Sequence, residues 1–173
     1  VIMKGEYPYF IHPLSDGVPI QSAELLAAAR DLINENVNWD EIDVILGLEA
    51  MGIPLAAALC LLSGKPLVIG RKRQYGLPGE TAVDQSTGYS KGAIYLNDIK
   101  EGDRVFVVDD VVSTGGTLLP VLKAIDSIGA IVGDCWIVFE KGEGMNYVRS
   151  HGDWPLNSLV RIEMDGNKVV LLE

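Results

Sequence analysis

The chain has 173 residues, of which 48% are hydrophobic and 22% are charged, and these are ordinary values for one globular domain. Its 14 Lys and Arg residues are outnumbered by 24 Asp and Glu residues, so the net charge is −10. A surface for nucleic acid needs clustered cations, and this balance therefore argues against a nucleic-acid partner. An anionic ligand would have to be held by local features such as backbone amides, a few cations or a metal ion.

Cysteine placement and hydropathy indicate a cytoplasmic protein. Cys60 and Cys135 lie far apart in apolar stretches without the spacing of metal ligands, so we expect buried free thiols. The longest apolar run, 53–62, is about half the length of a membrane span, and no signal segment opens the chain. We therefore expect no membrane partner.

The first half of the chain predicts helices and strands in alternation. Apolar residues at helical spacing follow Ser22, which is placed to cap a helix. The run 42–47 is typical of a short buried strand. A helix follows it, with Pro54 in the first turn and Gly64 just past the end, and 66–70 predicts the next strand.

The second half begins with a different kind of segment. The stretch 71–91 is polar, is punctuated by Gly and Pro and has no sustained period, so we expect a mobile loop there. Beyond it, 104–110 predicts a strand and about 117–128 predicts a helix that Gly129 ends. Further extended segments are expected at 92–96, 130–139, 158–163 and 168–173. Because the strands are apolar on both faces, the prediction is an α/β fold with a parallel sheet flanked by helices.

The segment VFVVDDVVSTGGT, residues 105–117, carries the chemistry. The carboxylates of Asp109 and Asp110 end a strand, and a turn of hydroxyls and glycines, 113–117, leads into a helix. Ligands of parallel sheets bind beyond the carboxyl ends of strands, and the amides at a helix N-terminus favour phosphate. Two carboxylates beside a phosphate site suit two neighbouring sugar hydroxyls. The alternative is a plain strand-to-helix turn with solvated acids.

This segment resembles the phosphoribosyl pyrophosphate signature of the type I phosphoribosyltransferases, and the likeness extends over about 44–139. GLEAMGIPLAAAL resembles the pyrophosphate loop of that family and its helix. RKRQYGLPGE and STGYSKGAIYL resemble the mobile catalytic loop of adenine phosphoribosyltransferases and of their archaeal hypoxanthine/guanine relatives. With KGEYPYFIHPLSDG included, the nearest likeness is to the archaeal hypoxanthine/guanine group.

The resemblance implies an enzyme that joins a purine base to phosphoribosyl pyrophosphate, which carries Mg²⁺, without metal ligands from the protein. It implies a homodimer, a single domain and a small hood from about 1–20 and 139–173. Catalytic roles fall on Asp109, Asp110 and Tyr89, the last of which would close over the site. The substrate-binding residues would be Glu49, Ala50, Met51, Gly52, Arg71, Lys72, Arg73, Ser113, Thr114, Gly115, Gly116, Thr117, Phe139, Glu140 and Lys141.

Two departures from the family pattern bear on the base. Gly88 stands where adenine enzymes usually have Glu, and Ser113 stands where many hypoxanthine-guanine enzymes have Asp. The acid-base role is therefore open among Glu80, Asp84 and Glu140.

Base preference is expected to depend on the segment after the strand 130–139. Phe139 would pack on the purine and Lys141 would donate to a 6-oxo group, with Tyr7, Tyr9 and Phe10 as hood residues. We expect hypoxanthine first and guanine second, with adenine as the alternative. A non-catalytic sensor of the ribosyl donor ranks last, because the chain shows no DNA-binding module.

Overall fold

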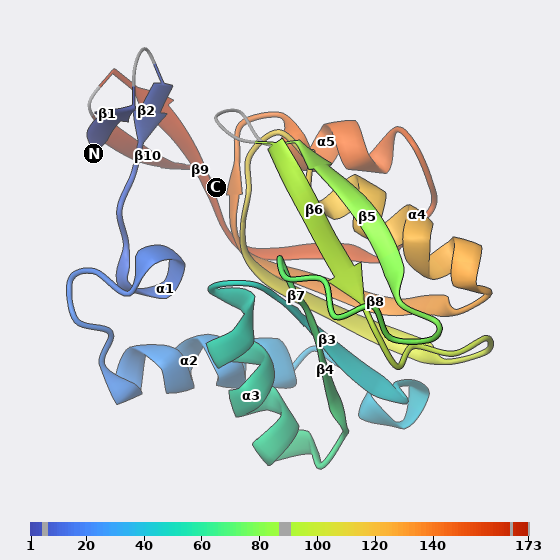
Figure 1. The fold of residues 1–173 in the computed structure, drawn as a ribbon. Coiled ribbons are helices and arrows are strands. Elements are labelled where there is room, and N and C mark those ends of the chain that lie inside the picture. Colours follow the sequence, from blue (N-terminus) through green and yellow to red (C-terminus); the bar gives the residue numbers. More distant parts are fainter. Residues whose placement is uncertain (5–6, 87–90, 167, 173) are drawn as a thin grey trace.

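A computed structural model describes residues 1–4, 7–86, 91–166 and 168–172. The strands of its central sheet are Val44–Leu48 (β3), Leu67–Gly70 (β4), Arg104–Val112 (β7), Ile131–Lys141 (β8), Leu156–Asp165 (β9) and Lys168–Leu172 (β10). Their order among the described residues is β10-β9-β8-β7-β3-β4 (Figure 1). Every neighbouring pair is parallel except β9 and β10, so the predicted parallel sheet is confirmed.

Helices cover both faces of this sheet. One face packs against Ala23–Asn34 (α2) and Gly52–Ser63 (α3), and the other against Leu118–Ile128 (α4) and Gly144–Arg149 (α5) (Figure 1). Alternate residues of a strand enter opposite cores: in β7, Val105 and Val107 join the α4 side, while Phe106 and Val108 join the α2–α3 side. This is why β7 is apolar at every position from Val105 to Val108.

The expected helix ends are found in the structure. The Ser22 hydroxyl accepts a 3.2 Å bond from the Leu25 amide at the start of α2. Gly64 and Gly129 end α3 and α4 in the left-handed conformation. Cys135 is a buried free thiol as predicted, whereas Cys60 is only half-buried. No described helix is long and apolar enough to span a membrane.

The N-terminal segment forms a small separate unit at the corner of Figure 1 where β9 and β10 extend. It contains an antiparallel hairpin, Ile2–Lys4 (β1) with Tyr7–Tyr9 (β2), and the short helix Pro13–Asp16 (α1). A 3₁₀ turn, Trp39–Glu41 (η1), lies later, after α2. The ring of Phe10, just after β2, meets the ring of Phe139 on β8 edge-on at 5.2 Å.

The expectation of an irregular stretch over 71–91 is only half right. Thr81–Ser86 (β5) pairs antiparallel with Lys91–Leu96 (β6), and this hairpin packs against α4 (Figure 1). Val83, Ile94 and Leu96 are buried in this hairpin, and the two adjacent apolar residues of β5, Ala82 and Val83, give no periodic signal in the sequence. Residues 87–90, which include Gly88 and the expected catalytic Tyr89, lie outside the described residues.

Candidate active site

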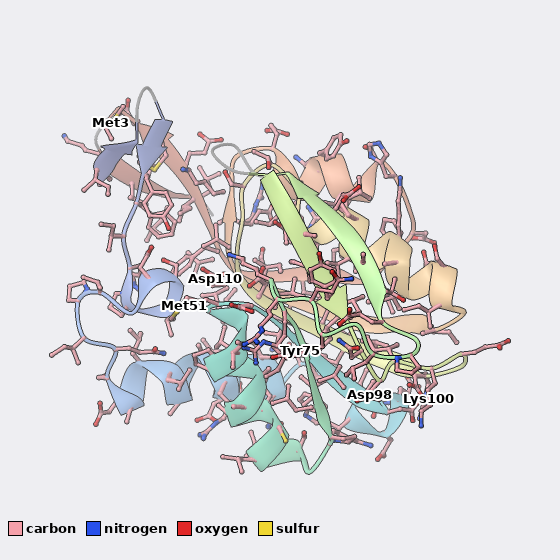
Figure 2. All side chains as sticks on the ribbon, in the orientation of Figure 1. Met3, Met51, Tyr75, Asp98, Lys100 and Asp110 are labelled. Carbon is pink, nitrogen blue, oxygen red and sulfur yellow. The ribbon has the colours of Figure 1, made fainter. Side chains whose placement is uncertain are left out.

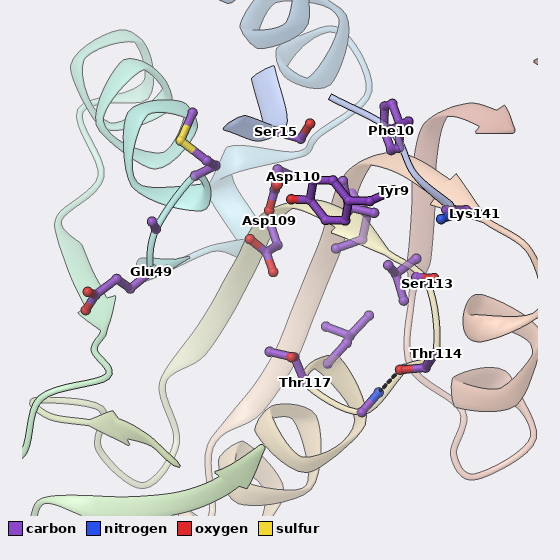
Figure 3. A pocket seen from close by; sticks show the side chains of 18 of the residues that line it. Tyr9, Phe10, Ser15, Glu49, Asp109, Asp110, Ser113, Thr114, Thr117 and Lys141 are labelled. Atoms are coloured by element: carbon purple, nitrogen blue, oxygen red, sulfur yellow. Dashed lines mark hydrogen bonds between the residues drawn. The ribbon is translucent and has the colours of Figure 1, made fainter. Parts of the chain in front are cut away.

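A cavity of about 260 Å³ opens beyond the carboxyl ends of β3, β7 and β8 (Figure 3). Its floor is the end of β7, one wall is the loop between β3 and α3, and the opposite wall is the loop between β7 and α4. Side chains from β2, the residue after it and α1 complete the lining. This volume lies just below the roughly 300–1,000 Å³ of typical small-molecule pockets, so the cavity suits a small molecule rather than a polymer.

Asp109 and Asp110 lie at the floor of this cavity and are partly buried. Burial raises the pKa of the Asp109 carboxyl well above its usual range, and the neighbouring charge of Asp110 adds to this. Burial also raises the pKa of Asp110, to about 6. Burial thus favours the neutral form of both carboxyl groups, and a carboxyl that carries a proton can donate as well as accept, a combination suited to hydroxyl groups.

The loop 113–117 follows β7 and leads into α4, as predicted, and all five of its residues line the cavity. The Gly116 amide donates a 3.3 Å bond to the Thr114 hydroxyl (Figure 3). Gly115 has a φ of +78°, and a Cβ there would lie 2.8 Å from Val148 Cγ2 on α5. A side chain at Gly115 would therefore collide with the protein behind the loop.

The loop 49–52 between β3 and α3 forms the facing wall. Glu49, Ala50 and Met51 line the cavity, and the peptide between Glu49 and Ala50 is cis. Gly52 does not line it. A Cβ on Gly52 would lie 2.7 Å from the Val108 carbonyl oxygen and 3.0 Å from Asp109 Oδ1, so the glycine allows α3 to approach β7 closely.

Of the three consecutive cations that follow β4, only Lys72 lines the cavity. The Lys72 amide donates a 2.9 Å bond to the Glu49 carboxylate, and Arg71 Nε lies 3.5 Å from the same oxygen. The guanidinium groups of Arg71 and Arg73 lie 5.9 and 5.6 Å from the centre of the Tyr75 ring. The expectation that all three cations face the ligand is therefore not met in this conformation, because Glu49 and Tyr75 hold the two arginines.

Lys141, at the end of β8, is buried and lines the cavity, as expected. The expected neighbours Phe139 and Glu140 do not line it. Phe139 packs against Phe10 and against the ring of His12, whose centre is 4.8 Å away. The strand continues through these positions. Glu140 accepts a bond from the Ser158 hydroxyl and lies near the guanidinium groups of Arg149 and Arg161, so its carboxylate faces away from the cavity.

The hood side of the cavity contains one residue that sequence reasoning missed. Tyr9 and Phe10 line the cavity as hood residues, and Ser15 of α1 joins them. The Tyr9 and Ser15 hydroxyls each donate a 2.6 Å bond to the Asp16 carboxylate. Asp16 thus holds the two hood side chains in place. The sequence indicated Ser15 only by its place in a short polar segment. The side chain of Tyr7 lies outside the described part of the chain.

The two other open acid-base candidates lie away from the cavity lining. Glu80 accepts bonds from the Tyr75 and Gly76 amides and from the Asn97 side chain, so it braces its own loop. Asp84 is exposed on β5.

A model of the phosphoribosyl transferase domain matches residues 20–172. The chain belongs to the phosphoribosyltransferase family. A hypoxanthine/guanine phosphoribosyltransferase of Ferroglobus placidus is 52% identical over 172 residues, which cover 98% of this chain and 91% of the relative. A second relative of that name, from Methanothrix thermoacetophila, is 49% identical over 175 residues, with 100% and 90% coverage.

Solved structures of the phosphoribosyltransferase family agree with the fold. The adenine phosphoribosyltransferase of Rhodothermus marinus superposes with a TM-score of 0.70 at 26% identity, covering 81% of each chain. That of Thermoanaerobacter pseudethanolicus gives 0.70 at 23% identity, covering 81% and 82%, and supports the fold alone. The fold predicted from the sequence, a parallel sheet flanked by helices, is thus the fold of solved phosphoribosyltransferases.

Proposed function

We propose that the protein transfers the phosphoribosyl group of phosphoribosyl pyrophosphate to a 6-oxopurine, hypoxanthine or guanine, and releases pyrophosphate. The observation that carries this proposal is the composition of one cavity. The acid pair Asp109–Asp110, the loop 113–117 and the buried Lys141 all line it. The names of the relatives that are about half identical to this chain point to the same substrates.

Each wall of the cavity suits one part of the substrates. The acid pair is placed to bind the two ribose hydroxyls, and the loop 113–117 the 5′-phosphate, through amides at the start of α4. The loop 49–52 and Lys72 face the acid pair and suit the pyrophosphate. The remaining wall, with Tyr9, Phe10 and Lys141, is left for the base.

The bond that breaks joins the anomeric carbon of the ribose to the pyrophosphate oxygen, and the bond that forms joins the same carbon to a purine nitrogen. The anomeric carbon gains positive character as the leaving group departs. The protein contributes position, through the acid pair and the loop 113–117, and exclusion of water, which is a competing nucleophile. We infer that the segment 71–91 closes over the cavity during this step.

We infer that Mg²⁺ arrives with the donor. Among the described residues, no group of three His, Cys, Asp or Glu side chains is arranged to hold a metal ion. The residues fit a metal held mainly by the phosphate oxygens of the donor, with Asp109 and Asp110 as nearby carboxylates. Bound there, Mg²⁺ would stabilise the negative charge of the leaving pyrophosphate.

Lys141 favours a 6-oxopurine over adenine, because its ammonium group donates hydrogen bonds and the exocyclic amine of adenine also donates. Adenine remains the second candidate, since the solved structures named above are adenine enzymes that share this fold. We further propose that the protein is a homodimer, which analytical ultracentrifugation of the full chain would test. We also propose that it is located in the cytoplasm. A donor sensor without catalysis is the least favoured function.

The deciding experiment measures pyrophosphate release from the Mg²⁺-bound donor with hypoxanthine, guanine, adenine and xanthine in turn. We expect the highest kcat/KM with hypoxanthine or guanine. Release that is fastest with adenine would contradict the base assignment but leave the reaction intact. Donor binding without release in the presence of any base would favour the sensor.

A further inference from the structure

The buried carboxylate of Glu140 lies behind the phosphate loop and not in the cavity. Glu140 is 2% exposed, and its Oε2 accepts a 2.9 Å bond from the Ser158 hydroxyl. Oε1 lies 3.6 Å from an Arg149 nitrogen and 3.5 Å from an Arg161 nitrogen. No described group donates a hydrogen bond to Oε1, so the two guanidinium charges are its compensation.

The three charged residues come from three elements that meet at this point. Glu140 is on β8, where its backbone pairs with Val112, the last residue before the phosphate loop, and with Arg161 on β9. Arg149 is in the last turn of α5. The carboxylate therefore ties α5 to the sheet at the position where the loop 113–117 begins.

The helix that is tied down forms the back of the phosphate loop. A Cβ on Gly144, the first residue of α5, would lie 2.4 Å from the Ser113 carbonyl carbon and oxygen. A Cβ on Gly115 would meet Val148 of α5 at 2.8 Å and the Gly144 carbonyl oxygen at 3.0 Å. Backbone thus rests on backbone at two places, and any shift of α5 displaces the loop.

The helix needs such a tie because it is short. A helix of six residues has little stability of its own, so its position depends on what it packs against. Met145 and Val148 are buried under it, but apolar contacts tolerate sliding. Arg149 also donates to the Leu156 carbonyl at 3.5 Å and to the Asn146 side chain at 3.2 Å, which orients its guanidinium group.

We propose that Glu140 and Arg149 are positioning residues for the 5′-phosphate, which they serve through α5 and the loop 113–117 without touching the substrate. The inference rests on the proposed function of that loop. Arg161 shares the carboxylate oxygen but comes from β9 and makes no described ion pair with α5. Its loss should therefore matter less than the loss of Arg149.

The test compares Arg149→Ala, Arg149→Lys, Glu140→Gln and Arg161→Ala, with Arg30→Ala as a control at an exposed ion pair on α2. For Arg149→Ala we expect the KM for the donor and the Kd for ribose 5-phosphate to rise about tenfold, while the KM for hypoxanthine stays within about twofold. Arg149→Lys should recover most of the loss. Glu140→Gln should behave like Arg149→Ala. Arg161→Ala should raise the Kd for ribose 5-phosphate by about threefold or less.

A second readout does not depend on any ligand. Amide hydrogen exchange over 113–117 should be faster in Arg149→Ala than in the native chain and in Arg161→Ala. Equal exchange in all three, or equal KM changes for donor and base, would overturn the inference. If the native chain binds no ribose 5-phosphate, the proposed function fails, and the exchange rates still decide whether α5 positions the loop. If Glu140→Gln fails to fold, the comparison of Arg149→Ala with Arg149→Lys still tests the inference.

Discussion

The phosphate side and the base side of the cavity are built in different ways. The phosphate side is backbone: the loop 113–117 rests on α5 and continues from the centre of the sheet. The base side is made of side chains, Tyr9, Phe10, Ser15 and Lys141, most of which come from the N-terminal unit. The match to the family begins at residue 20, so that unit precedes the matched region. The walls proposed to hold the donor, and also Lys141, thus lie inside the matched region, whereas Tyr9, Phe10 and Ser15 lie outside it.

The largest expected effect is on the base side. Lys141→Ala should compress the preference for hypoxanthine over adenine by roughly 2–4 kcal/mol, because the donor to a 6-oxo group is lost. Competition kinetics with both bases measures it. Lys100→Ala is the control, since Figure 2 places this exposed lysine well away from Asp110. An unchanged ratio would mean that another group reads the 6-position.

On the donor side, Asp110→Asn should weaken binding of the Mg²⁺-bound donor by about 1–3 kcal/mol, because a charged acceptor of ribose hydroxyls is lost. Asp109→Asn should cost less, because burial and the neighbouring Asp110 raise the pKa of Asp109 well above its usual range and so favour its neutral form, which an amide resembles. Calorimetric titration compares the two. Asp98→Asn, at an exposed turn, is the matched control (Figure 2). A larger loss for Asp109→Asn would reverse the assigned protonation.

Stability and donor affinity should depend on pH in opposite ways at Asp110. The pKa is raised to about 6, so the folded chain binds this proton more tightly than the unfolded chain does. The contribution to stability is present at low pH and is lost as pH rises through about 6, whereas donor affinity should rise over the same range. Asp110→Asn should therefore be stabilised relative to the native chain at pH 7.5 by roughly 1–2 kcal/mol, allowing for solvent screening in the cavity, and by less at pH 5.

Denaturant unfolding of both chains at the two pH values measures this difference. If the free energy of unfolding changes equally for the two chains between pH 5 and 7.5, the pKa of Asp110 is not raised by folding. A native chain whose donor affinity does not change between pH 5 and 7.5 would show that ionised Asp110 is not needed for binding.

The smallest effect should come from the hood. Asp16→Asn weakens the bonds that hold Tyr9 and Ser15 over the cavity. The KM for hypoxanthine should therefore rise about fivefold, which corresponds to about 1 kcal/mol, while the KM for the donor does not change. Steady-state kinetics with each substrate varied in turn gives the split. Asp31→Asn, on the exposed surface of α2, is the control. Equal changes in both KM values would place the hood over the whole cavity.

The sequence predicted the cavity lining at the end of β7 well and the lining near the hood poorly. An apolar strand that ends in two acids and a glycine turn is a local pattern, so Asp109, Asp110 and the loop 113–117 were found together. Phe139 and Glu140 were misplaced because β8 runs to Lys141, two residues beyond its expected end at Phe139. No periodicity marks where the strand stops. Contacts from other elements hold both side chains, Phe139 against Phe10 and Glu140 at the Ser158 hydroxyl, and the local sequence does not indicate them.

Other features depend on contacts that local patterns do not carry. The strand β5 exists because Val83 packs against α4, and Ser15 enters the cavity because Asp16 organises a segment far away in the sequence. The role of Gly144 is visible only when α5 and the loop 113–117 are seen in contact. Tertiary packing, and not propensity, decides all three.

The close approach at Gly52 has a consequence for how the cavity opens. A single methyl group at this position would collide with the backbone of β7 and with Asp109, so the gap between the start of α3 and the acid pair has no spare width. The two walls that would grip the ribose and the pyrophosphate must then move as one rigid piece. We therefore expect substrates to enter and products to leave by displacement of the rim, either the N-terminal unit or the segment after β4, while the floor keeps its shape.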